Sequence, residues 1–225
     1  MNDWLSSPFF GIILCIAAFA VGVYIQKRFK TPLANPLLIS TALVIIFLNV
    51  FDISFENFNQ GGQIITMLLA PATAVLAMSI YRQFAILKKY FIPTLAGCLA
   101  GSVTSIITIL LLCRAFGLDE TLTSSLMPKS VTMPIAVGIS EQHAGIASIT
   151  VAAVVLTGIF GAVFAPVMAR LFRIKNPVSV GVAIGTSSHV GGTTTAIQMG
   201  EVEGAMSSIA IGVAGLITTV IAIFL

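Results

Sequence analysis

Lys129 is the most informative residue of this sequence chemically, because it is the only charged residue between Glu120 and Glu141. It stands between Pro128 and Ser130 in the segment TLTSSLMPKSVTMPIAVGIS. In a membrane protein an embedded ammonium group is costly and marks a substrate or ion pathway. We therefore predict that Lys129 binds an anionic group of a substrate. The open alternative is that its long side chain extends to the external membrane surface.

A second polar cluster, around His189, interrupts the apolar segment SVGVAIGTSSHVGGTTTAIQMG at residues 179–200. Imidazole titrates near neutral pH, so His189 is a candidate for proton coupling; the alternative is a structural hydrogen bonder. The hydroxyl groups and glycines of both segments either bind substrate or let helices pack closely. Besides Lys129 and His189, the predicted substrate-binding residues are Ser130, Thr132, Ser187, Ser188, Gly192, Thr193 and Thr195.

Carboxylates and helix-breaking residues accompany these two segments. Glu141 and Glu201 follow them and, with His189, are the candidates for pairing with a coupling ion; the alternative is that these loop carboxylates are solvated. Proline removes a backbone donor and clashes with the preceding turn, and glycine-rich stretches weaken helices. Half-helix ends at such breaks present free N–H groups that attract anions. The predicted helix breaks are Pro128, Pro134, Gly185, Gly191 and Gly192.

Transmembrane helices must position these residues. Of the 225 residues, 57% are hydrophobic and 8% are charged, whereas soluble domains carry about 25% charged residues. We predict an all-α polytopic membrane protein, a single membrane domain over residues 1–225 with about six full transmembrane helices. Apolar runs long enough to cross a bilayer, about 20 residues, lie at Phe9–Ile25, Leu33–Phe51, Ile64–Tyr81, Phe91–Cys113, Ile146–Met168 and Ala205–Leu225.

Charge placement predicts the topology. Nine of the eleven basic residues fall into clusters at 27–30, 82–89 and 170–175, and none of the eight acidic residues lies in these clusters. By the positive-inside rule these three loops are cytoplasmic. The N-terminus and the loops at 52–62 and 114–121 are then external. The net charge of +3 therefore reflects membrane topology and does not indicate nucleic-acid binding.

The two polar segments do not cross the membrane simply. Residues 121–141 must leave the external face and return to it, and they are too few for two crossings. We predict a re-entrant hairpin or two half-helices meeting at mid-membrane. Residues 178–200 either form a second re-entrant segment, which we favour, or span as one broken helix. Each segment follows a long apolar helix, in opposite orientations, and such an inverted repeat is typical of transporters. Residues 1–90 would form scaffold helices and residues 91–225 the transport core.

No catalytic triad, cluster of metal ligands or phosphate-binding loop is evident in the sequence. Cys15, Cys98 and Cys113 lie inside apolar runs without paired spacing, as small apolar residues do. We therefore expect that the protein is not an enzyme and uses no cofactor and no metal.

The same polar segments resemble the LrgB/CidB (antiholin-like) membrane protein family. The matching motifs are Pro128–Ala136, Gly185–His189, Gly192-Thr193 and Glu203–Ala205. The resemblance implies modulation of murein hydrolase activity and cell lysis or, through the related plastid glycolate/glycerate translocator, movement of small monocarboxylates. It also implies a small LrgA/CidA-type membrane partner. Thr195 departs from the family pattern, which often has a basic residue there, and this leaves Lys129 as the embedded cation.

Two functions are therefore expected. The first is a transporter of a small monocarboxylate similar to pyruvate, glycolate or lactate, coupled to protons or sodium. Lys129 and hydroxyl groups would hold the substrate between half-helix ends. The alternative is a holin/antiholin-like protein that modulates murein hydrolase activity and cell lysis by oligomerising with its partner. In both cases we expect a multi-pass protein of the bacterial inner (cell) membrane that forms a homo-oligomer such as a dimer.

Overall fold

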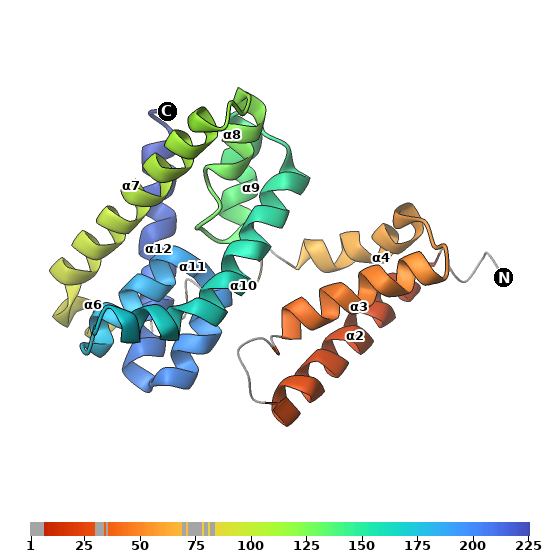
Figure 1. Ribbon diagram of the computed structural model, residues 1–225, viewed down its shortest axis with the longest axis horizontal. Coiled ribbons are helices and arrows are strands. Elements are labelled where there is room, and N and C mark those ends of the chain that lie inside the picture. Colours follow the sequence, from red (N-terminus) through yellow and green to blue (C-terminus); the bar gives the residue numbers. More distant parts are fainter. Residues whose placement is uncertain are drawn as a thin grey trace. The chain divides into compact units, whose positions relative to one another are not determined.

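The computed structural model describes residues 7–29, 34, 36–68, 71, 78, 81 and 84–225. Every regular element in these residues is a helix (Figure 1). Two compact units divide the chain, unit 1 at Met1–Thr73 and unit 2 at Ala74–Leu225. The expected all-α architecture is confirmed for the described residues.

Unit 1 contains α2 (Pro8–Phe29), α3 (Pro36–Val50) and α4 (Phe55–Met67), with α2 packed against both other helices. Gly11 of α2 and Gly61 of α4 allow this close approach, because a Cβ on either glycine would collide with the backbone of the other helix. The external placement of the expected loop over 52–62 stays a prediction, but the loop is helical from residue 55 onward. A helix starts there because the Ser54 hydroxyl accepts a hydrogen bond from the Asn57 N–H, 3.4 Å away.

Among the described residues, four helices are long and apolar enough to cross a membrane: α2, α7 (Phe91–Ala115), α10 (Ala147–Leu171) and α12 (Glu201–Ala222). They match the spans predicted from Phe9, Phe91, Ile146 and Ala205. The span predicted over Leu33–Phe51 corresponds to α3, which has only 15 residues. The span over Ile64–Tyr81 lies largely outside the described residues, as do Asp3, Lys30 and Arg82. The total of six spans stays a prediction.

Besides α7, α10 and α12, unit 2 contains α6 (Phe84–Lys89). The hairpin predicted over 121–141 is a pair of short helices in this unit. They are α8 (Glu120–Leu126) and α9 (Met133–Gln142), joined by a turn over 127–132. The Ile146 N–H, just before α10, donates to the Ser125 hydroxyl of α8 over 2.7 Å. The chain therefore leaves the hairpin beside the helix through which it entered, as two half-helices require.

Pro128 and Pro134 play different parts in this hairpin. Pro128 is fully buried within the turn, where it interrupts the helix as predicted. Pro134 lies in the first turn of α9 and so begins a helix rather than breaking one. The physical reason is that the N–H groups of a first helical turn have no intrahelical acceptor, so proline loses nothing there.

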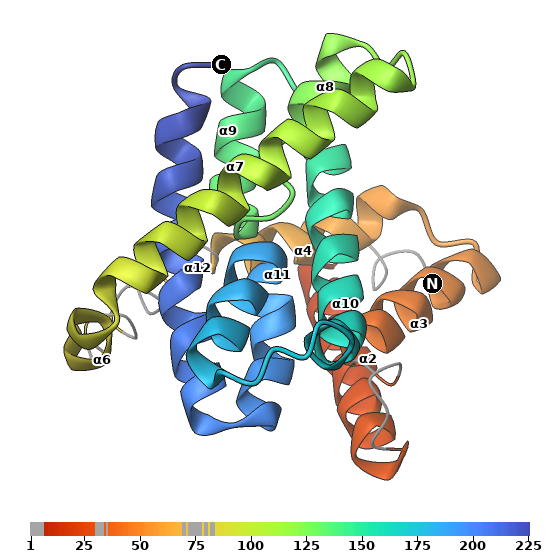
Figure 2. The ribbon, with the colours of Figure 1, turned by 60° about the vertical axis from the view of Figure 1, so that its left-hand side comes forward.

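The last interrupted segment, α11 (Pro177–Met199), doubles back on itself at His189, whose backbone is non-helical at φ 42° and ψ −140°. Contacts with α12 establish the reversal. In the first arm (177–188), Gly181 faces Glu203 and Gly185 faces Ser207, so this arm runs parallel to α12. In the second arm (190–199), Thr193 bonds to Ser207 and Ile197 faces Gly204, so this arm runs antiparallel. Figure 2 shows both arms beside α12. The geometry therefore agrees with re-entrance and not with one broken spanning helix.

The predicted helix breaks at Gly185, Gly191 and Gly192 are wrong, since all three residues lie within helical arms. These glycines serve close packing instead. A Cβ on Gly185 would collide with the Ser207 carbonyl of α12, and one on Gly191 would lie 2.6 Å from the Gly158 Cα of α10. The chain reverses at the residue between them, His189, whose φ of 42° and ψ of −140° lie outside the left-handed helical region that non-glycine residues sometimes adopt.

Unit 2 thus contains two successive pairs, each a long helix followed by a hairpin: α7 with α8–α9, and α10 with α11. This is the order of elements that an inverted repeat requires. The symmetry between the pairs, the side of the membrane on which each end lies, and the division into scaffold and transport residues stay predictions.

Candidate functional site

Lys129 lies at the turn of the α8–α9 hairpin. The turn is held by hydrogen bonds from the Lys129 N–H to the Leu126 carbonyl (3.2 Å) and from the Val131 N–H to the Pro128 carbonyl (3.3 Å). The Lys129 ammonium donates to the Ser130 hydroxyl over 3.3 Å, and that hydroxyl lies 2.8 Å from the Ser105 hydroxyl of α7. A chain of polar contacts therefore links the ammonium group to α7.

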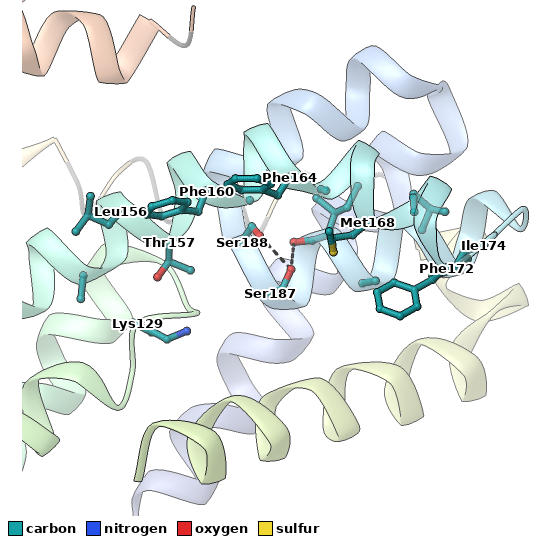
Figure 3. A pocket seen from close by; sticks show the side chains of 17 residues that line it. Lys129, Leu156, Thr157, Phe160, Phe164, Met168, Phe172, Ile174, Ser187 and Ser188 are labelled. Carbon is teal, nitrogen blue, oxygen red and sulfur yellow. Dashed lines mark hydrogen bonds between the residues drawn. The ribbon is translucent and has the colours of Figure 1, made fainter. Parts of the chain in front are cut away.

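Two cavities of unit 2 meet at Lys129, on the two sides of the first arm of α11. The aromatic cavity, about 700 Å³, lies between this arm and α10, and Figure 3 shows Lys129 and Thr157 at one end of it. The hydroxyl cavity, about 770 Å³, lies between the same arm and α7. Its polar lining consists of Thr104, Ser105, Thr108, Lys129, Ser130, Ser179, Thr186 and Ser187.

Among the residues that the structure describes, Lys129 is the only charged one that lines either cavity. No ion pair joins it to any acidic side chain in the described part of the chain, and its ammonium group bonds there to Ser130. An unpaired cation between two cavities attracts an anion, because the low dielectric of a membrane protein's interior strengthens the interaction. The site can therefore hold one carboxylate.

The start of α9 adds a second positive feature near Lys129. Thr132 is the N-cap residue, and its buried hydroxyl has no hydrogen-bond partner among the described residues. The N–H groups of Met133 and Ile135 belong to the first turn, which has no intrahelical acceptors, and Pro134 has no N–H. The positive end of the helix dipole thus begins three residues after Lys129 in the chain.

Both ring nitrogens of His189 form hydrogen bonds with backbone groups. Nε2 lies 2.9 Å from the Val154 carbonyl, which can only accept, so Nε2 carries the proton. Nδ1 accepts from the Gly191 N–H over 3.4 Å. The neutral ring therefore ties the reversal of α11 to α10. This arrangement favours the structural role of His189 over proton coupling, which stays an untested prediction.

The other predicted substrate residues separate into two groups. Ser130, Ser187 and Ser188 line the cavities. Thr193 bonds to Ser207 and to the His189 carbonyl, and Thr195 donates to the Ala162 carbonyl over 3.1 Å. Thr132, His189, Gly192, Thr193 and Thr195 lie outside both linings, and the last three belong to the packing of the second arm.

Glu141 and Glu201 are exposed and do not line either cavity. Glu141 lies in the last turn of α9 and Glu201 is the first residue of α12. A coupling ion bound beside Lys129 would therefore not use these carboxylates. Their position favours the alternative that they are solvated.

Sequence reasoning missed the hydroxyls of α7 and the aromatic residues of α10. Thr104, Ser105 and Thr108 gather on one face of an otherwise apolar helix, since residues three and four apart are neighbours. Phe160 and Phe164 show the same spacing. These spacings are visible in the sequence, but the facing wall that makes them part of a cavity is not.

Known proteins share the segments that build this site. The sequence profile described as the LrgB-like family matches residues 15–225. Proteins named "Antiholin-like protein LrgB" from Bacillus cereus (strain B4264) and from Bacillus anthracis (strain A0248) are each 38% identical over 216 residues, which cover 96% of this chain and 94% of the relative. No solved structure matches the chain. With its apolar spans and hairpins, this chain is a multi-pass membrane protein that belongs to the LrgB family.

Proposed function

We propose that this chain binds a small monocarboxylate and moves it across the membrane through unit 2. The observation that supports the proposal is the unpaired Lys129 ammonium at the junction of two cavities. One fixed cation matches one carboxylate, whereas a second carboxylate would enter a site without a second cation. Pyruvate, glycolate and lactate are the simplest candidates.

Hydroxyl groups around Lys129 support binding of the rest of a small acid. Ser105, Ser130 and Ser187 can donate to a carbonyl or hydroxyl oxygen beside the carboxylate. The proposed function includes no enzymatic activity. It includes coupling to protons or sodium, with water or an ion reaching the site through the same cavities.

Uptake of labelled pyruvate, glycolate and lactate into proteoliposomes tests this function, with and without a pH gradient. We expect saturable uptake that Lys129→Met removes and that Lys175→Met, an exposed lysine outside both cavities, retains. Equal uptake by wild type and Lys129→Met, or no uptake above protein-free liposomes, would reject it.

The name that these relatives share supports a second candidate more directly than it supports transport. That name, antiholin-like protein, favours a regulator of murein hydrolase activity and cell lysis. Such a protein would act as an oligomer or with a small LrgA/CidA-type membrane partner. Passage of unrelated neutral solutes without saturation, together with an unchanged phenotype of Lys129→Met in a lysis assay, would favour this candidate.

A further inference from the structure

We infer that the aromatic cavity receives an apolar arm of the substrate, so that the favoured ligands are monocarboxylates with a branched aliphatic or aromatic tail. This inference rests on the proposed function, in which Lys129 binds the carboxylate. The inference extends the candidate substrates to monocarboxylates whose tail is larger than that of a three-carbon acid.

A continuous apolar stripe on α10 forms one wall of this cavity. Its members are four residues apart and all line the cavity: Leu156, Phe160, Phe164, Met168 and Phe172. Residues four apart are neighbours on a helix surface, so the stripe follows α10 to its C-cap residue Phe172 while winding slowly around the axis. The rings of Phe160 and Phe164 are stacked, with centroids 5.9 Å apart and planes inclined by 15°. The wall therefore offers flat aromatic surface at Phe160 and Phe164.

The charged group of the cavity lies at one end of this stripe. Figure 3 shows Lys129 and Thr157 near Leu156 and Phe160, Ser187 and Ser188 nearer Phe164 and Met168, and Phe172 and Ile174 at the far end. The opposite wall, from the first arm of α11, is apolar through Val180, Ala183 and Ile184 before Ser187 is reached. A ligand with one charged end and one apolar end matches this gradient.

Cavity size points to the same class of ligand. A volume of about 700 Å³ lies within the range of roughly 300–1,000 Å³ that holds drug-sized ligands. Phe160 and Phe164 are 58% and 47% exposed and line the cavity, so their rings are accessible to a ligand there. Each methylene buried there should raise affinity roughly fourfold. The hydroxyl cavity on the other side of the arm has no comparable aromatic wall among its described lining residues.

Equilibrium binding to the purified protein in nanodiscs tests the inference with pyruvate, 4-methyl-2-oxopentanoate and phenylpyruvate, after subtraction of empty nanodiscs. We expect affinity to rise in that order. The double variant Phe160→Ala/Phe164→Ala should lose about tenfold or more for phenylpyruvate and less than about twofold for pyruvate, because only the larger tail covers these rings. Phe116→Ala, at an exposed phenylalanine outside the cavities, is the matched control. Phe160→Leu/Phe164→Leu keeps the apolar volume if the alanine variant does not fold, and should weaken phenylpyruvate more than 4-methyl-2-oxopentanoate.

Three outcomes would overturn the inference. Affinity that is independent of the tail, with pyruvate uptake still dependent on Lys129, rejects the apolar arm and leaves the proposed function intact. A tail preference that both phenylalanine variants retain places the tail elsewhere. A change of oligomeric mass without a change of affinity assigns the stripe to contacts between copies of the chain. Absence of any Lys129-dependent binding, by contrast, rejects the proposed function itself.

Discussion

Lys129 of the α8–α9 turn and Ser187 of the first arm of α11 line the same two cavities. The two residues come from different hairpins, 58 positions apart in the chain. A substrate that moves between the cavities would remain within reach of both the ammonium group and the hydroxyl group. This shared position makes Lys129 the first residue to test.

Replacing Lys129 should weaken carboxylate binding without lowering the stability of the protein. Lys129→Met is expected to weaken carboxylate binding by about 10- to 100-fold, because hydrogen bonds to charged groups contribute about 1.5–3 kcal/mol. Thermal unfolding should occur at the same temperature or higher, since an unpaired embedded charge has been removed. Lys129→Arg should also impair binding, because a planar guanidinium does not replace a compact ammonium. Normal binding by Lys129→Met would mean that this lysine is no anion site.

His189 provides a test of proton coupling. Because both ring nitrogens contact backbone groups, His189→Gln, whose amide can still donate to the Val154 carbonyl, should leave the pH profile of uptake unchanged. His189→Ala should lower the free energy of unfolding by about 1–3 kcal/mol through the lost hydrogen bonds of the ring. A pH profile that flattens in His189→Gln while folding is retained would restore the proton-relay role.

Two glycine-to-alanine substitutions, one as the test and one as its control, probe the packing of the hairpins. Gly185→Ala should destabilise unit 2 by about 1–3 kcal/mol, as overpacking does, because its Cβ would meet the Ser207 carbonyl and the Ala210 side chain of α12. A methyl group added at Gly138, inside α9, would meet no described neighbour within 4 Å. Gly138→Ala should therefore stabilise the protein by about 0.5–1 kcal/mol. Equal thermal shifts for the two variants would contradict the close contact of α11 with α12.

Cysteine labelling tests the predicted orientation. Cys15, Cys98 and Cys113 are first replaced by alanine, and a single cysteine is introduced at Leu118 or at Lys175. If the basic loops are cytoplasmic, an impermeant thiol reagent added outside intact cells should label Leu118→Cys and not Lys175→Cys. Labelling of both positions after permeabilisation is the control. The reverse pattern would invert the predicted topology.

Local properties of the sequence determined the class of protein, four of the long helices and the α8–α9 hairpin. Run length and hydropathy depend only on neighbouring residues, so the spans from Phe9, Phe91, Ile146 and Ala205 were predictable. The hairpin was predictable because residues 121–141 are too few for two crossings. Lys129 was identifiable as the only charged residue between Glu120 and Glu141.

Only the tertiary structure decided where α11 reverses and which side chains face Lys129. Glycine weakens a helix locally, but Gly185 and Gly191 stay helical because α12 and α10 need their backbones close. The reversal instead falls at His189, whose ring is held by Val154, 35 positions earlier. The hydroxyl group of Ser105 and the ring of Phe160 reach cavities beside Lys129 through the rotation and packing of α7 and α10. Contacts between such distant segments leave no local periodicity by which a sequence could reveal them.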